Sequence, residues 1–197
     1  MKKSMALLLV SGLLIPTWVA AADKLENIKL VWKPTTTLSK LGGIDPNGIK
    51  VKIQLQPLAD ARDNAALIGE NREKANAPKK VTTQENVPAF VTDKLKKVIT
   101  DAGLSVVEGG GEVVLVGELQ KFFVEETSEY SGELRVKFTA KNPSGKELWT
   151  GSVLGHASNF GRSYKDDNYY ETLSNSIVDA TVVLFRDAGL RRALGAQ

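Results

Sequence analysis

Cysteine is absent from the 197 residues of this sequence. Its absence excludes disulfide bonds, thiol nucleophiles, thiolate metal sites and iron–sulfur clusters. It also excludes an acyl anchor on an N-terminal cysteine. The folded chain must therefore be stabilised by its hydrophobic core alone, which a domain of roughly 150 residues or more can supply.

Histidine is almost as scarce, because His156 is the only one. A Ser-His-Asp site would have to combine it with Ser152 or Ser158, but these serines lie along the same strand and no G-x-S-x-G motif occurs. One histidine among scattered carboxylates gives no metal-ligand spacing. The glycine run 109–111 lacks the Gly-Lys-Ser/Thr sequence of a phosphate-binding loop. We therefore predict no catalytic residue, no cofactor and no metal ion.

Net charge is also small. The formal charge is +3, and it falls to +1 if Lys2 and Lys3 are removed with a leader peptide. Nucleic-acid binding depends on concentrated positive charge. This near-balance argues against a nucleic-acid partner.

A long hydrophobic run occurs only near the N-terminus, where a basic start precedes an apolar stretch from 5 to 15 and then small residues. The pattern predicts a cleaved signal peptide over residues 1–22, with cleavage after Ala21 or Ala22. The alternative is a membrane anchor. However, a spanning helix needs about 20 apolar residues, and a serine, a glycine and a proline interrupt this run.

Alternation of apolar and polar residues predicts the strands of one sheet. The stretches 49–56 and 133–141 alternate with period two, which is typical of strands with one buried face. The segment 146–158 follows an Asn-Pro-Ser-Gly turn and returns as the last strand. Residues 104–108 and 112–126 flank the glycine run, so we expect a hairpin between two further strands there.

Apolar residues at spacings of three and four predict two helices. The first begins at a capping box formed by Thr82 and Glu85 and ends at Gly103. The second begins near Asn168 and is broken at Gly189. Residues 58–83, before the first helix, show no sustained period, so we expect a long excursion with one helical turn near 65–68.

Together these elements predict an α+β fold. It consists of a single mixed, mainly antiparallel sheet of about five strands with two helices packed on one face, in the order β-α-β-β-β-β-α. The opposite face is expected to be solvated. The expected divisions are a signal peptide at 1–22, an N-terminal strand ("NIKLVWKP") and turn-rich connector at 23–48, an α+β domain at 49–190 and a C-terminal tail at 191–197.

Charged residues gather directly after the strand 49–56, in "LADARDNAALIGENR". Paired carboxylates perform acid–base chemistry when burial separates their pKa values, so Asp60, Asp63 and Glu70 are candidates for a cell-wall or glycan hydrolase. Arg62 and Arg72 are close in sequence and would instead keep these carboxylates ionised. We interpret the group as a structural or recognition clasp made of Asp60, Arg62, Asp63 and Arg72.

Basic and aromatic residues suggest a surface for a partner. Basic side chains lie on every second strand residue, and tyrosines gather before the last helix. The alternatives are a solvated sheet face and core packing at the end of the sheet. The candidate partner surface consists of Lys50, Lys52, Arg135, Lys137, Lys141, Tyr164, Tyr169 and Tyr170.

Several motifs occur in a familiar order: a strand ending in Pro34, Asp60-Ala61-Arg62, Ile68-Gly69, and a helix leading into "AGLSVVEGGGEVVLVGELQKF". In this order they resemble the YajG family of Gram-negative envelope lipoproteins. The resemblance implies a cell-envelope protein with an α+β domain, no established enzyme activity and no active-site residues. The family has a lipidated cysteine at the mature N-terminus, whereas this sequence has "VAAAD".

We therefore expect an exported, non-enzymatic protein, in the periplasm, secreted or peripherally associated with the envelope. It would act as an accessory or binding module for an envelope protein, glycan or lipid, with no transmembrane segment after signal cleavage. The hydrolase described above is the alternative function. A subunit of a larger envelope assembly is a third hypothesis.

Overall fold

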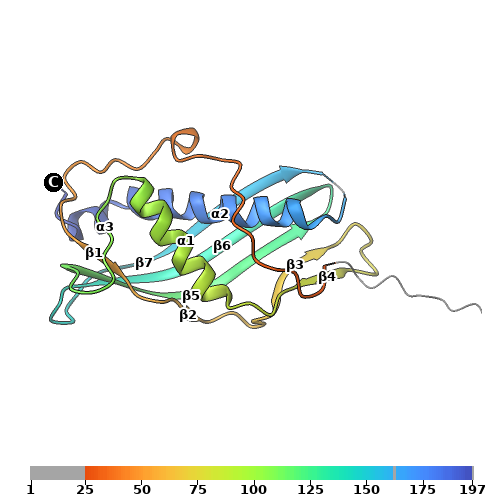
Figure 1. Cartoon of the computed structure of the whole chain (residues 1–197), viewed down its shortest axis with the longest axis horizontal. Helices are drawn as coiled ribbons and strands as arrows, with labels where there is room; N and C mark the ends of the chain where they lie inside the picture. Colours follow the sequence, from red (N-terminus) through yellow and green to blue (C-terminus); the bar gives the residue numbers. More distant parts are fainter. Residues whose placement is uncertain (1–24, 162, 197) are drawn as a thin grey trace, which may run out of the picture.

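The computed structural model describes residues 25–161 and 163–196, so the predicted signal peptide lies outside the described residues. The α+β class is confirmed (Figure 1), with one mixed sheet of seven strands and three α-helices where about five strands and two helices were expected. The elements are a 3-10 turn η1 (Ser39–Leu41), β1 (Ile53–Leu55), β2 (Ala59–Asp60), β3 (Leu67–Asn71), β4 (Lys79–Thr82), α1 (Val87–Asp101), β5 (Val113–Glu126), β6 (Glu129–Lys141), β7 (Glu147–Phe160), α2 (Asp166–Arg186) and α3 (Ala188–Ala193).

The antiparallel meander β5-β6-β7 forms the larger part of the sheet. Alternate residues of β6 are buried, as the period-two pattern predicts. The predicted turn between β6 and β7 is present, with the Asn142 N–H donating to the Lys146 carbonyl over 2.9 Å. Strand β7 is the last strand in the order β4-β3-β5-β6-β7.

Strands β1, β2 and β3 lie one after another along the free edge of β5, and each is parallel to it. The prediction of an excursion with a helical turn near 65–68 is wrong, because this region forms β2, β3 and the antiparallel pair β3-β4. Ile68 is fully buried. Gly69 lies opposite Val124 of β5, where an added Cβ would be 2.6 Å from the Tyr169 ring. Tertiary pairing and packing thus decide the structure of a segment whose own sequence shows no period.

The predicted hairpin around the glycine run is also wrong, because β1 lies between its two arms. The Ile53 N–H donates to the Ser105 carbonyl over 2.8 Å, and the Val107 N–H donates to the Ile53 carbonyl over 2.9 Å. On its other side, β1 pairs with Val113 and the residues that follow it. The glycine-rich loop therefore crosses over β1 at Gln54, where a Cβ added to Gly111 would lie 2.8 Å from the Gln54 backbone nitrogen.

The predicted N-terminal strand at 27–34 is not a strand. Its backbone bonds instead to a carbonyl and to side chains of other elements: the Ile28 N–H donates to the Thr82 carbonyl, the Leu30 N–H to the Glu85 carboxylate and the Lys33 N–H to the Ser174 hydroxyl. Because Glu85 is engaged there, the predicted capping box is wrong. Asn86 caps α1 instead, accepting from the Ala89 N–H over 3.0 Å.

The helical layer ends differently from the prediction. Helix α2 stops at Arg186, and Asp187 caps α3 by accepting from the Leu190 N–H, so the predicted break at Gly189 is wrong. Leu194 and Ala196, in the predicted C-terminal tail, are buried in the core. The predicted domain boundaries remain a prediction.

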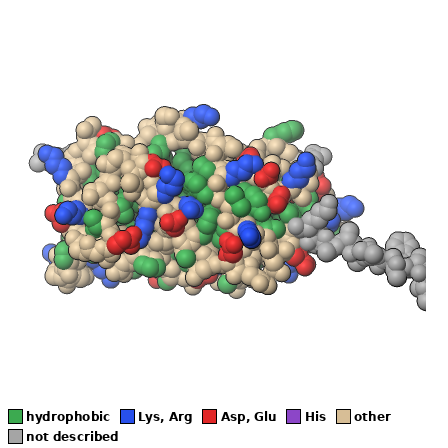
Figure 2. All heavy atoms as spheres, viewed as in Figure 1, with side chains coloured by type: hydrophobic (Ala, Val, Ile, Leu, Met, Phe, Trp, Pro, Cys, Tyr) green, Lys and Arg blue, Asp and Glu red, His purple; other side chains and the backbone are tan. Residues whose placement is uncertain are grey.

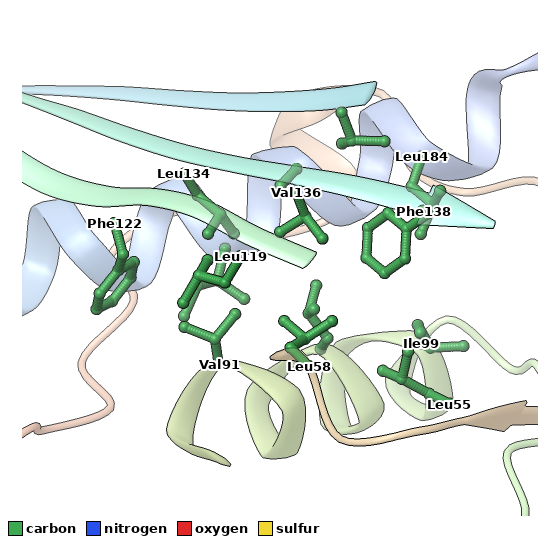
Figure 3. Close-up of a cluster of buried hydrophobic side chains, with 14 of the residues drawn as sticks. Leu55, Leu58, Val91, Ile99, Leu119, Phe122, Leu134, Val136, Phe138 and Leu184 are labelled. Atoms are coloured by element: carbon green, nitrogen blue, oxygen red, sulfur yellow. The ribbon is translucent and has the colours of Figure 1, made fainter. Parts of the chain in front are cut away.

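The hydrophobic core lies between the helices and one face of the sheet. Figure 3 shows Val91 and Ile99 of α1 directed toward side chains of the strands, among them Leu119 and Phe138. Helix α2 packs closely on β6 and β7, since a Cβ added to Gly155 would lie 2.6 Å from the Ala180 Cβ. On the side of the molecule shown in Figure 2, charged side chains of both signs are interspersed with hydrophobic ones.

No helix of the described residues covers the other face of β5, β6 and β7. Its side chains alternate with the buried ones along each strand, and those of β6 and β7 include exposed Arg135, Lys137, Leu154 and His156. We call this surface the open face. Within the described ranges 25–161 and 163–196, no helix has the length and apolar character of a membrane span.

Candidate functional site

A hollow of about 510 Å³ lies on the open face beside the loop 61–66, which joins β2 to β3. Asp60 pairs with Leu119 and Gly69 pairs with Val124, so the loop leaves the edge of β5 between these positions. Strand β5 shifts register between Leu119 and Lys121 at the same level. A loop on one side and an irregular strand on the other create this hollow, which we call the loop hollow.

Arg62 is held inside the loop by a fork of hydrogen bonds. Its Nε and Nη2 donate to the Asp60 carboxylate over 2.9 and 2.8 Å, and Nη2 also donates to the Ala65 carbonyl over 2.8 Å. The side chain is only 5% exposed. Nη1 is buried and has no hydrogen-bond partner within the described part of the chain. Arg62 therefore closes the loop and retains an unused donor.

The environment of Asp60 favours its charged form. Hydrogen bonds from the Arg62 side chain lower the pKa of Asp60, and they outweigh burial, which acts in the opposite direction. A general acid at neutral pH needs the reverse shift. Glu70 likewise accepts from Arg72 Nε over 2.6 Å. The hydrolase alternative needs a carboxylate that is not paired with an arginine. The Asp60–Arg62 and Glu70–Arg72 pairs therefore count against it.

The predicted clasp separates into two groups. Asp60 contacts Arg62, whereas Arg72 contacts Glu70 and also lies 3.1 Å from a Glu125 carboxylate oxygen of β5. Asp63 lines the loop hollow and makes no hydrogen bond or ion pair with other described residues. Arg62, Asp63 and Arg72 thus line the loop hollow, whereas Asp60 reaches it only through its contact with Arg62. Their role as a clasp stays a prediction.

A second hollow, of about 460 Å³, lies at the start of α1 and shares Arg62 with the first. Asp60 and Glu85 also line it, and both are carboxylates. Their negative charge opposes the positive end of the α1 dipole, so this hollow does not favour anions.

Three residues of the open face form an ion-pair network at the rim of the loop hollow. Glu133 accepts from Lys121 Nζ over 2.7 Å and from Arg135 Nη2 over 2.6 Å. Burial acts to raise the pKa of Glu133, but Lys121 and Arg135 outweigh it and hold that pKa below its ordinary value. Lys121 Nζ also lies 6.0 Å from the centre of the Phe123 ring. The network thus places the charged groups of Lys121 and Glu133 beside the Phe123 ring.

The residues of the predicted partner surface lie on several elements. Arg135, Lys137 and Lys141 belong to β6, whereas Lys50 and Lys52 precede β1. The tyrosines lie at the end of the sheet near the start of α2, and Tyr169 is fully buried, so it belongs to the core and not to a surface. The use of the remaining residues by a partner stays a prediction.

Sequence reasoning missed Phe123, Gln120, Lys121 and Glu133 as neighbours of Arg62. One signal was present in the sequence. The buried positions of β5 are odd-numbered up to Leu119 and even-numbered from Phe122, and this change of phase marks the register shift that places Phe123 on the open face. As to metal binding, the described residues contain no group of three or more histidines, aspartates or glutamates placed to hold a metal ion.

A scan against protein-family models and a search of curated proteins found no match. Among solved structures, the chain is similar to protein XCC0632 of Xanthomonas campestris, of the DUF330 family. The TM-score is 0.56 at 10% sequence identity, and the alignment covers 76% of this chain and 91% of that one. The two chains share a fold.

Two further solved structures bear the name lipoprotein or putative lipoprotein. A putative lipoprotein from Caulobacter crescentus has a TM-score of 0.44 at 9% identity, over 56% of this chain and 84% of that one. A minor lipoprotein from Acinetobacter baumannii has a TM-score of 0.41 at 12% identity, over 72% and 94%. The resemblance to the YajG family stays a prediction.

Proposed function

We propose that this protein is an exported, non-enzymatic binding module of the cell envelope, and that its partner binds on the open face at the loop hollow. The observation that carries the proposal is the loop hollow itself, formed where the loop 61–66 leaves the edge of β5. Its volume of about 510 Å³ falls within the range of roughly 300 to 1,000 Å³ typical of ligand pockets.

The groups in the loop hollow favour binding over catalysis. The Asp60 carboxylate is tied to Arg62, the Glu133 carboxylate to Lys121, and Arg72 to two glutamates. The pKa values of Asp60 and Glu133 are lowered by these cations, so the two carboxylates remain ionised at neutral pH and serve poorly as proton donors. Export is supported by the basic start, apolar run and small residues of the predicted signal peptide.

Site-specific photo-crosslinking in the cell that exports the protein tests this proposal. A photoreactive phenylalanine analogue is placed at Gln120, in the loop hollow, or at Lys97, on the exposed side of α1. We expect a discrete crosslinked envelope product from position 120 and none from position 97. Equal yields from both positions, or no product from either, would contradict a partner at the open face.

A further inference from the structure

The loop hollow offers hydrogen-bonding groups but no unpaired cation. Arg72 lies 2.6 and 3.1 Å from carboxylate oxygens of Glu70 and Glu125, and Lys121 lies 2.7 Å from one of Glu133. Arg62 is paired with Asp60. Because each of these cations already has a carboxylate partner, an anionic ligand would gain little attraction here.

Several uncharged donors and acceptors in the loop hollow are unused. Asn64 accepts two backbone N–H groups at its Oδ1, which leaves its NH2 group to donate. Gln120 and Ser131 line the loop hollow, and their side chains make no hydrogen bond to any other described residue. Arg62, whose guanidinium is charged, also lines the loop hollow, and its buried Nη1 has no hydrogen-bond partner among the described residues. Such a set matches a ligand that carries many hydroxyl or carbonyl groups.

Phe123 supplies an apolar surface among these polar groups. Its half-buried ring lines the loop hollow on the face of β5, while the preceding Phe122 is buried in the core. An aromatic ring next to amides suits a ligand whose flat side consists of C–H groups and whose edge consists of hydroxyls. Sugar rings have this construction.

The position of the loop hollow argues against an extended peptide. Peptides that bind to sheets gain affinity from backbone hydrogen bonds at a strand edge. The loop 61–66 borders the edge of β5 beside the loop hollow, where strand pairing is interrupted. The loop hollow itself opens on the face of β5 and β6, whose backbones pair with each other across Phe123 and Glu133. The lining therefore offers side chains to a ligand.

From these contacts we infer that the loop hollow binds an uncharged oligosaccharide, with one sugar ring against Phe123 and its hydroxyl groups bonded to Asn64, Gln120 and Arg62. The inference rests on the proposed function, because it names the chemistry of the partner at the same site.

Titration of the chain without residues 1–22 tests the inference. The probes are cellotetraose, chitotetraose and maltotetraose, with a galacturonate tetramer and a chitosan tetramer as charged counterparts, and binding is measured by calorimetry and by NMR shifts. We expect at least one neutral probe to bind and to shift signals from the loop 61–66 and from Phe123. The charged counterparts should bind at least about tenfold more weakly.

Matched variants locate the binding site. F123A should weaken binding at least about tenfold, whereas F160A, which removes an aromatic residue that is 92% exposed at the end of β7, should leave it unchanged. Q120A removes an exposed side chain that makes no hydrogen bond to another described residue, and it should weaken binding about fivefold with no change in thermal stability. It keeps the test valid if F123A does not fold.

Three outcomes would overturn the inference: no binding of any neutral probe, equal or tighter binding of a charged counterpart, or binding unaffected by F123A and Q120A. A crosslinked protein at position 120 together with no sugar binding would leave the proposed function standing and refute the oligosaccharide. Failure of both experiments would refute both.

Discussion

Arg62 links the backbone of the loop 61–66 to the end of β2. Its guanidinium bonds to a carboxylate on one side of the loop and a carbonyl on the other, so it replaces the strand pairing that is interrupted between β2 and β3. A planar group with five donors suits this position better than a lysine. The loop hollow therefore depends on one side chain for its shape.

Replacing Arg62 by alanine should destabilise the folded protein by about 2 kcal/mol, since hydrogen bonds to charged groups contribute roughly 1.5 to 3 kcal/mol. Urea denaturation measures this change. The control is R72A, which removes an arginine whose side chain is 52% exposed and should have a clearly smaller effect. If R62A and R72A lowered the free energy of unfolding equally, Arg62 would not be the residue that holds the loop.

Among the secondary-structure elements, helix α2 and the meander β5-β6-β7 define the fold. They meet where glycines remove side chains from the inner face: Gly132 faces Thr172, and Gly155 faces Ala180 and the backbone of Ser176. A methyl group at either glycine would have to displace α2. The close contact holds α2 on one face of the sheet. The loop hollow lies on the opposite, open face.

The G155A variant should lose about 1 to 3 kcal/mol of stability, as is usual when a packed core receives an extra methyl group. Thermal and urea denaturation would detect it. G109A is the matched control, because a Cβ at Gly109 meets no atom within 4 Å, and it should change stability by less than about 0.5 kcal/mol. A wild-type stability for G155A would mean that α2 sits farther from the sheet than described.

Local patterns predicted those elements that local contacts stabilise. Strand β6 and helices α1 and α2 show clear periods, because each buries one regular stripe of side chains. Strands β2 and β3 were missed because their partners lie on β5, far along the chain. For the same reason, charge in the sequence pointed to Asp60 and Arg62 but not to Phe123, which only the tertiary fold brings to them.

At the scale of the whole molecule, tyrosine side chains pack around the buried Glu126 carboxylate at one end of the sheet. Glu126 is fully buried, and it accepts from the Tyr169 hydroxyl and from the Tyr164 N–H, each over 2.9 Å. The Tyr130 and Tyr169 rings meet edge to face at 5.2 Å. Burial, and next the charge of Glu126, raises the pKa of Tyr169 well above its ordinary value of 10.0.

Because the folded state holds the Tyr169 proton more tightly than the unfolded state, its contribution to stability is complete below pH 10 and is lost as the pH rises above 10. We expect alkaline unfolding that coincides with the appearance of tyrosinate absorbance. Y169F should lose about 1 to 3 kcal/mol at neutral pH, because Glu126 loses a donor, and should show a weaker alkaline dependence. An alkaline profile of Y169F identical to that of the wild type would contradict this account.

The parallel placement of β1, β2 and β3 along β5 has a consequence for biosynthesis. A ribosome delivers the N-terminal part of a chain first, so residues 53–71 emerge before the strand at 113–126 that completes their hydrogen bonding. Until then they are unpaired extended segments with apolar residues, and closing such distant pairings is slow. The nascent chain is therefore most exposed to aggregation and to proteases before β5 appears. A chaperone that covers this region during that interval would protect the whole molecule.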